Sequence, residues 1–308
     1  MSAQVSAAEF RSMHERLRAS VPWGPADRRG ALNYIKPEMV IEAAGQIRLG
    51  RHVSLAAEIE HLPGPDNQDP ARHQMLSPAG AETSPAGLAF AYDRFAMNIH
   101  GDADTHLDAL CHVIFDGTLY NALAPDAVTQ AGAQELAVDT AHAGLVGRGV
   151  LLDIPRTREV RWLEPGHHVT AEDLTAAEAA QGVRVGEGDL LFVRVGHRRR
   201  KRELGAWDAA SARAGLHPEA MQFVADRRVA LLGSDGNSDC APSVVAGVDF
   251  PVHALAINAL GLQLLDYLDF GDLVQACERA SRWTFFAVIA PLRLPAATGS
   301  PVNPIAIL

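Results

Sequence analysis

The chain contains 308 residues, of which 48% are hydrophobic and 21% are charged, and its formal net charge is −10 at pH 7. This length and composition are typical of a globular protein with a substantial core, in one large domain or two small ones. Nucleic acid is not expected as a partner, because phosphate binding requires a basic surface. The one basic run, residues 197–202, is interpreted as a solvated loop or a local contact between subunits.

Two further features bear on the compartment. The first 20 residues are polar, without an apolar core of the signal-peptide type, and no run of about 18 apolar residues occurs in the chain. The three cysteines, Cys111, Cys240 and Cys277, are too few and too scattered for a disulfide framework. We therefore expect a cytoplasmic protein without a membrane partner.

The first hundred residues predict two helices and a long loop. Residues 9–19 have a helical pattern, and a Lys-Pro-Glu start signal precedes a second helix over residues 39–49. Residues 1–50 are therefore predicted as an N-terminal helical arm. Residues 62–87 are rich in Pro, Gly, Asp and Ser, which indicates a long surface loop. A loop of this length before a functional motif suits a lid, and disorder is the alternative.

A dense group of side chains that can coordinate a metal follows at residues 102–112, DADTHLDALCH. His106 and Asp108 are two positions apart, so on an extended strand their side chains leave the same face. Burying both groups is costly unless something compensates them, and a divalent cation bound by imidazole and carboxylate would do so. Asp102 would supply a third ligand and leave one position open for water. The alternative is a hydrogen-bonded His–Asp pair without a metal.

Beyond this motif, short apolar runs alternate with helical patterns. Strands are predicted at residues 149–154, 189–195, 229–233 and 284–290. Helices are predicted at residues 170–180, 218–226 and 253–262, the first with a capping box formed by Thr170 and Asp173. The alternation is typical of an α/β fold with a mixed or partly parallel β-sheet flanked by helices. No glycine-rich nucleotide-binding motif follows a strand, so nucleotide binding is not expected.

The 102–112 motif resembles the signature of the cyclase family of metal-dependent hydrolases, which includes kynurenine formamidase and isatin hydrolase. The family signature reads His-x-Gly-Thr-His-x-Asp-x-Pro-x-His. The residues that match it in register are Thr105, His106, Asp108 and His112. The second half of the signature is therefore intact.

The first half of the signature is altered. Asp102 stands where the family has its first His, Asp104 replaces the Gly, and Leu110 replaces the Pro. His100 would point to the same face as Asp102 if the strand were regular, so it is a second candidate for the first ligand position.

The resemblance covers most of the chain, from residue 23 to the end, and implies a single cyclase-like domain over residues 1–308. His253 and Asp266 fall where kynurenine formamidase-like members have a His and a Glu that bind metal. Asp266 is one methylene shorter than Glu. By themselves, the residues favour a core histidine at a helix start for His253 and a turn residue for Asp266. Asp235 and Asp239 are interpreted as residues that shape a loop.

The function that the resemblance implies is hydrolysis of a small amide, formamide or cyclic amide by metal-activated water. His112 would be the catalytic acid or base. The implied metal ligands are Asp102, His106, Asp108, His253 and Asp266. One or two Mn²⁺ or Zn²⁺ ions are expected, with Asp108 as the bridge between two, and the three carboxylates favour manganese. The resemblance also implies a small-molecule substrate and a homodimer or homotetramer.

Two alternatives remain beside this reading. Within enzymes, the same core could serve a lactone or ester hydrolase or a cyclising dehydratase. The other class is a degenerate, non-catalytic cyclase-like protein that binds a ligand. The replacements at Asp102, Asp104 and Asp266 favour this second class. Catalysis is favoured by the intact second half of the signature, which consists of Thr105, His106, Asp108 and His112.

Overall fold

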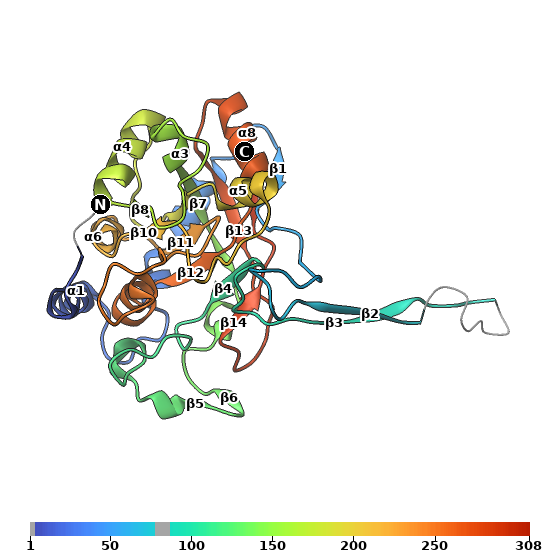
Figure 1. Ribbon diagram of the computed structural model, residues 1–308, viewed down its shortest axis with the longest axis horizontal. Helices are drawn as coiled ribbons and strands as arrows, with labels where there is room; N and C mark the ends of the chain where they lie inside the picture. Colours follow the sequence, from blue (N-terminus) through green and yellow to red (C-terminus); the bar gives the residue numbers. More distant parts are fainter. Residues whose placement is uncertain (1–3, 78–86) are drawn as a thin grey trace.

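The computed structural model describes residues 4–77 and 87–308, and a nine-stranded sheet forms its centre. The strands of this sheet are β1 (His52–Ser54), β4 (His106–Asp108), β7 (Leu145–Asp153), β9 (Leu190–Arg194), β11 (Leu231–Ser234), β12 (Gln263–Asp266), β13 (Thr284–Ile289), β14 (Gly299–Pro301) and β15 (Ile305–Ile307). Their order is β1-β15-β13-β7-β9-β11-β12-β4-β14. Strands β7, β9, β11 and β12 run parallel, and antiparallel strands extend the sheet on both sides. The predicted α/β fold with a mixed sheet is confirmed (Figure 1).

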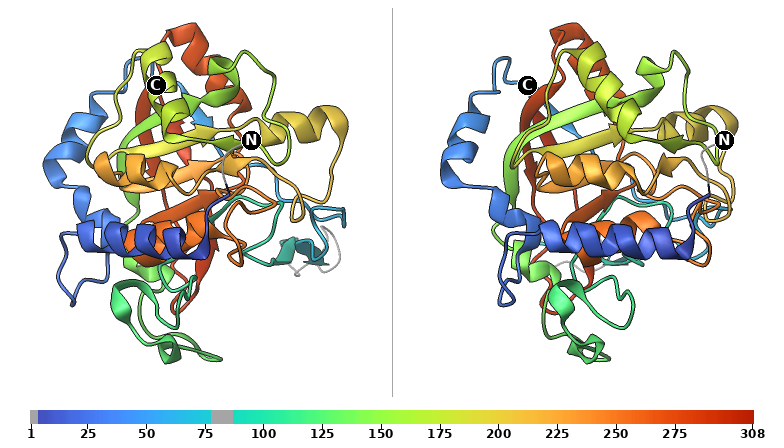
Figure 2. Two further views of the ribbon diagram at one scale, coloured as in Figure 1. Left: turned by 60° about the vertical axis from the view of Figure 1, so that its left-hand side comes forward. Right: turned by 90° about the vertical axis from the view of Figure 1, so that its left-hand side faces the viewer.

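Helices surround this sheet. The α-helices are α1 (Ala7–Ser20), α2 (Pro37–Ala44), α3 (Ile154–Thr157), α4 (Ala171–Gln181), α5 (His197–Leu204), α6 (Ala220–Asp226), α7 (Pro251–His253) and α8 (Gly271–Ala280). A π-helix, η5 (Ala254–Leu260), continues α7. The 3₁₀ turns are η1 (Gly30–Tyr34), η2 (Tyr120–Ala122), η3 (Pro125–Ala127) and η4 (Val138–Ala141). Helix α1 packs along η5, as Figure 2 shows, and α2 packs against β7. Within the described ranges, no helix is long and apolar enough to cross a bilayer.

Three small two-stranded sheets lie outside the central one. They are β2 (Arg72–Ser77) with β3 (Tyr92–Ala96), β5 (Val128–Thr129) with β6 (Gly132–Ala133), and β8 (His168–Val169) with β10 (Gly215–Leu216). The first of them projects far from the body of the molecule (Figure 1). The prediction of a loop over residues 62–87 was therefore wrong for Arg72–Ser77, and residues 78–86 of it lie outside the described part. Every β2 and β3 side chain is exposed or half-buried, so the apolar run that marks a buried strand is missing.

The four strands predicted from apolar runs are confirmed as β7, β9, β11 and β13. All five side chains of β9 are buried, as expected for a central strand that is covered on both faces. The predicted capping box of α4 is also confirmed. The Thr170 hydroxyl accepts from the Asp173 backbone N–H, and the Asp173 carboxylate accepts from the Thr170 backbone N–H. Local polar and apolar patterns thus set most of the elements that carry the site.

The most informative differences from the predicted helices lie in α2 and in the helix that begins at Pro251. The helix expected over residues 39–49 ends at Ala44, because the chain beyond it pairs with the C-terminus: Leu49 donates its N–H to the Leu308 carbonyl, at 2.9 Å. The helix expected from residue 253 starts at Pro251 and becomes the π-helix η5. The helices of residues 1–50 pack on the body, with Phe10 and Leu17 buried in the core.

Candidate metal centre

The 102–112 motif contributes strand β4, which lies between β12 and β14. In the antiparallel registers, His106 lies opposite Asp266 of β12, and Asp108 lies opposite Gly299 of β14. Strand alternation places His106 and Asp108 on one face, as predicted, and the cross-strand pair adds Asp266 to that face. Asp108 and Asp266 are fully buried, so the strand places two carboxylates in an interior that must compensate them.

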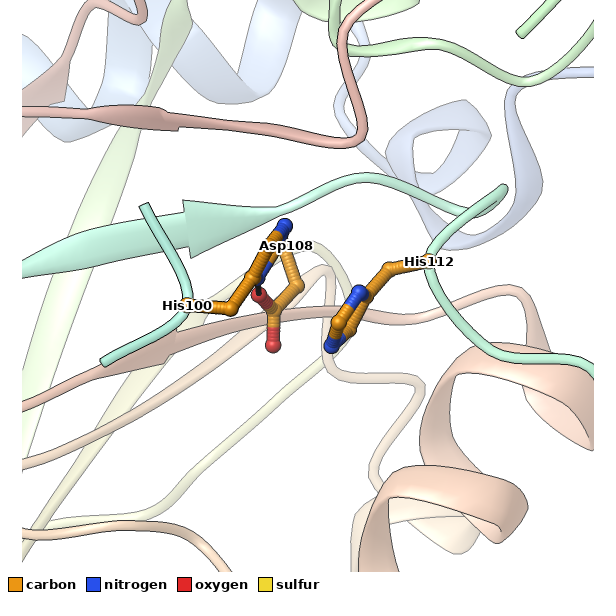
Figure 3. Close-up of side chains that lie close together, drawn as sticks. All are labelled: His100, Asp108 and His112. Carbon is orange, nitrogen blue, oxygen red and sulfur yellow. Dashed lines mark hydrogen bonds and ion pairs between the residues drawn. The ribbon is translucent and has the colours of Figure 1, made fainter. Parts of the chain in front are cut away.

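A first group of side chains forms around one oxygen of Asp108 (Figure 3). His100 Nδ1 lies 2.8 Å from Asp108 Oδ1. The His112 ring stacks on the His100 ring, with 3.7 Å between centroids and 5° between planes. One ligand atom from each of the three residues lies within 4.8 Å of the other two, which is close enough for a shared metal ion.

A second group forms around the other oxygen of Asp108. His253 Nε2 lies 3.4 Å from Asp108 Oδ2 and 3.7 Å from Asp266 Oδ2. The ligand atoms of Asp108, His253 and Asp266 also lie within 4.8 Å of one another. Asp108 is therefore common to both groups, which is the arrangement needed for a carboxylate that bridges two ions.

Asp239 orients His253 within the second group. The Asp239 Oδ2 atom lies 2.5 Å from His253 Nδ1 and 3.0 Å from the His253 backbone nitrogen. A carboxylate accepts, so Nδ1 carries a proton, and Nε2 is the ring nitrogen that faces Asp108 and Asp266. The neighbouring Ser238 hydroxyl donates to Asp266 Oδ1 at 2.6 Å. Asp239, which the sequence indicated only as a loop residue, therefore helps to build the site.

The ring of His106 is also oriented by a hydrogen-bond acceptor at its Nδ1 atom. Its Nδ1 atom lies 2.8 Å from the Asp104 carbonyl oxygen, which can only accept, so Nδ1 is the donor. The Nε2 lone pair then faces Asp108 Oδ1 at 3.6 Å. His106 is not a member of either group, in each of which the ligand atoms lie within 4.8 Å of one another, but it lies beside both.

Asp102 joins neither group. Its Oδ1 atom accepts a 2.6 Å hydrogen bond from the Tyr267 hydroxyl. His100, the second candidate for the first ligand position, lies against Asp108 instead. Asp104 accepts from the Glu60 backbone N–H at 2.9 Å and holds a neighbouring loop. Of the residues considered for the ligand set, the structure brings together His100, Asp108, His112, His253 and Asp266.

The surroundings fix the charge on three of these side chains. Burial opposes ionisation of Asp108, but close contacts with His100 and His253 outweigh it and hold its pKa well below the ordinary value. Burial would lower the pKa of His253, yet its contacts with Asp108 and Asp239 dominate and raise that pKa well above the ordinary value. Burial lowers the pKa of His112 to about 4, so this imidazole is neutral at pH 7.

The residues present fit a divalent cation. Asp108 Oδ2 is buried and makes no hydrogen bond with the residues that the structure describes. Asp108, Asp239 and Asp266 are all fully buried within a few ångströms of one imidazole, His253. Buried carboxylates are stable only when positive charge or hydrogen bonds compensate them. Imidazole nitrogens and carboxylate oxygens are also the ligands that zinc and manganese prefer.

A cavity of about 620 Å³ opens onto both groups. Its lining includes His100, Asp102, His106, His112 and His253. The apolar part of the lining consists of Val113, Ile114, Phe115, Val248 and Phe250. The volume suits a small organic molecule, and the lining combines polar side chains with an apolar surface.

Known proteins share this fold. The model of the Cyclase family matches residues 34–238. The crystal structure of a novel cyclase aligns with a TM-score of 0.86 at 30% identity, covering 96% of this chain and 99% of that chain. Isatin hydrolase A from Labrenzia aggregata, bound to benzyl benzoate, aligns with a TM-score of 0.61 at 22% identity, covering 86% and 94%. Isatin hydrolase A from Ralstonia solanacearum aligns with a TM-score of 0.59 at 23% identity, covering 86% and 93%. A comparison with curated proteins finds no match.

The chain belongs to the Cyclase family, because the family model covers well over half of it and the cyclase structure matches it almost from end to end. The resemblance seen in the 102–112 motif is thereby confirmed at the level of the family. The two isatin hydrolases have the same fold.

Proposed function

We propose that this protein is a metal-dependent hydrolase that cleaves a carbon–nitrogen bond in a small amide, formamide or cyclic amide. The observation that carries the proposal is the pair of His and Asp groups that share Asp108, because the imidazoles of both groups line the cavity. The names of two structures with the same fold support the reaction class, because isatin is a cyclic amide.

Two neighbouring positions would hold the metal. His100, Asp108 and His112 would form one, and Asp108, His253 and Asp266 would form the other. Because Asp102 lies outside both groups, imidazoles outnumber carboxylates in this ligand set. We therefore propose zinc or manganese, without the preference for manganese that three carboxylates would give. When bound, such an ion supplies Lewis acidity that activates water and polarises a carbonyl group.

The side chains that line the cavity would transfer protons and bind the substrate. The neutral His112 has a ring nitrogen available to accept a proton from water and return it to the leaving nitrogen. The same lone pair would instead bind a cation if His112 is a ligand, and its place in the first group allows this. The apolar surface around Phe115 and Phe250 would bind the hydrocarbon part of the substrate and exclude water.

The experiment is metal analysis by plasma mass spectrometry, combined with turnover on a panel of amides, lactams, esters and lactones. We expect one or two equivalents of zinc or manganese, and hydrolysis of amides or lactams that stops on chelation. Asp108→Ala should lose both metal and turnover. His112→Ala should keep the metal held by Asp108, His253 and Asp266, and should lose turnover by about 10²–10⁴-fold, as expected for a general acid or base.

Other outcomes are equally informative. Loss of all metal in His112→Ala would show that His112 acts as an essential ligand, and would remove it as the base. Turnover confined to esters and lactones would replace the proposed substrate class. A protein that binds no metal even after reloading would contradict the proposal and favour the non-catalytic ligand-binding alternative.

A further inference from the structure

One carboxylate in the lining of the cavity, that of Asp102, belongs to neither group of candidate metal ligands. Its Oδ1 atom accepts the 2.6 Å hydrogen bond from the Tyr267 hydroxyl. Its Oδ2 atom has no hydrogen-bond partner among the residues that the structure describes, and it is not closed off from solvent. Asp102 thus offers one free acceptor to a molecule in the cavity, while the bond at its other oxygen orients the carboxylate.

The Tyr267 residue that holds Asp102 is itself fixed in a strained conformation. It is fully buried, and its backbone lies in the left-handed region at a φ of 57°. Bulky residues are rare there, because the Cβ atom crowds the following carbonyl oxygen. Hydrogen bonds from the Thr105 hydroxyl at 2.6 Å and from Arg198 Nη2 at 2.5 Å, both to the Tyr267 carbonyl, hold the backbone in place. Strained residues cluster at functional sites, so the strain at Tyr267 indicates a functional role for the pair that it forms with Asp102.

The charges in the cavity lining indicate what Asp102 would bind. Among the described residues that line the cavity there is no lysine or arginine, and the other carboxylate is that of the exposed Asp249. The remaining polar side chains are four imidazoles and the amide of Asn237. An ionised carboxylate only accepts hydrogen bonds, so a partner for Asp102 Oδ2 must be a donor. A positively charged donor makes the strongest such bond and also compensates the charge of the half-buried carboxylate.

We propose that Asp102 determines the specificity of the cavity by binding a protonated amine, so that the substrates are small amides that also carry an ammonium group. The inference rests on the proposed function, because it names the substrate class of the same site. The ammonium group would donate to Asp102 Oδ2, and the apolar surface around Phe115 and Phe250 would bind the hydrocarbon part of the molecule. The family signature has an imidazole at the position of Asp102, so this preference would belong to the present chain.

The test compares the binding of benzylammonium and benzyl alcohol to the metal-loaded protein at pH 7, by isothermal titration calorimetry. The two probes have the same ring and nearly the same size, and they differ in charge. We expect the native protein to bind benzylammonium at least about 10-fold more tightly, as a charge-assisted hydrogen bond would give. This comparison needs no variant, so it remains decisive if a substitution prevents folding.

The variant Asp102→Asn keeps the shape of the side chain and removes its charge. It should bring the ratio of the two affinities close to one, with little change in the affinity for benzyl alcohol. Asp249→Asn is the matched control, because it removes the same charge from the lining of the same cavity. Exposed charge pairs contribute little, so the control should change the ratio by less than about fivefold. Melting temperatures of both variants verify that they are folded.

Two results would overturn the inference. One is a native protein that binds both probes equally well. The other is an equal loss of preference in Asp102→Asn and Asp249→Asn, which would show a general attraction between charges in place of a specific contact.

Turnover of matched amides, with an ammonium group in one and a methyl group in the other, separates this inference from the proposed function. A higher kcat/KM for the ammonium member that is lost in Asp102→Asn would support both. Hydrolysis without such a preference would overturn the inference and leave the proposed function standing. Preferential binding of benzylammonium without hydrolysis of any amide would overturn the proposed function and keep Asp102 as an amine-binding residue.

Discussion

The orientation of the His253 ring depends on the carboxylate of Asp239, which no sequence motif indicates. Asp239 Oδ1 accepts from the Val252 backbone N–H at 2.6 Å, while Oδ2 accepts from both the backbone and the ring of His253. One fully buried side chain therefore anchors the start of α7 and fixes the imidazole tautomer. Partners of this kind orient the ligands of metal sites and raise their basicity.

The variant Asp239→Asn should weaken metal binding about 10–100-fold, the usual cost of losing an oriented partner. An amide nitrogen placed against Nδ1 favours the tautomer whose proton sits on Nε2, the atom that faces Asp108 and Asp266. Competition with a chromophoric chelator measures the affinity, and Asp226→Asn at the exposed end of α6 is the matched control. Affinity in Asp239→Asn equal to that of the control would contradict this role.

At the scale of single residues, the sequence predicts part of the candidate metal centre. His106 and Asp108 share a face because a strand repeats every two residues, and the structure places both in β4. The same rule failed to choose between His100 and Asp102, because β4 begins only at His106 and the residues before it do not alternate. His100 therefore reaches Asp108 from outside the strand, whereas Asp102 turns toward Tyr267.

At the scale of elements, strand β7 packs closely against strand β13. Gly149 pairs with Phe285, and a Cβ atom added at Gly149 would lie 2.2 Å from the buried Phe285 ring. Gly147, two residues earlier on the same strand, has no atom nearer than 3.6 Å to such a Cβ. Only one of these two glycines is thus required by packing.

Gly149→Ala should lower the free energy of unfolding by about 1–3 kcal/mol, the usual cost of overfilling a packed core. Gly147→Ala should change it by less than about 0.5 kcal/mol, because the added methyl group makes only ordinary contacts. Urea unfolding followed by circular dichroism measures both. Equal effects of the two substitutions would show that the Phe285 ring moves aside without cost.

The contrast between buried and exposed strands explains which elements can be predicted. The strands β7, β9, β11 and β13 are recognisable because burial demands apolar residues. The strands β2 and β3 are exposed, so burial sets no pattern on their residues and a loop was expected instead.

For the whole molecule, the metal centre should also be a source of stability. Burying Asp108, Asp239 and Asp266 near one another is unfavourable until a cation compensates them. An ion present at 100 times its dissociation constant stabilises the folded state by about 2.7 kcal/mol. Chelation should therefore lower the melting temperature by several degrees, because about 1 kcal/mol corresponds to roughly 2–4 °C in large domains.

Differential scanning fluorimetry with and without EDTA measures this shift, and the metal is added back to test reversibility. The control is Asp108→Ala, which lacks the carboxylate common to both groups and should show no effect of the chelator. A native protein whose melting temperature is the same with and without EDTA would contradict the expectation.

The α/β class, most strands and helices of the body, and the His106–Asp108 pair could all be predicted from the residues alone. These features follow from short-range periodicity and capping, which act over a few residues. The family resemblance already grouped His253 and Asp266 with Asp108, but the choice of His100 over Asp102 and the role of Asp239 beside His253 became visible only in the folded chain. These contacts join residues that lie far apart along the chain, and their partners are chosen by strand order and register. No local pattern encodes that choice.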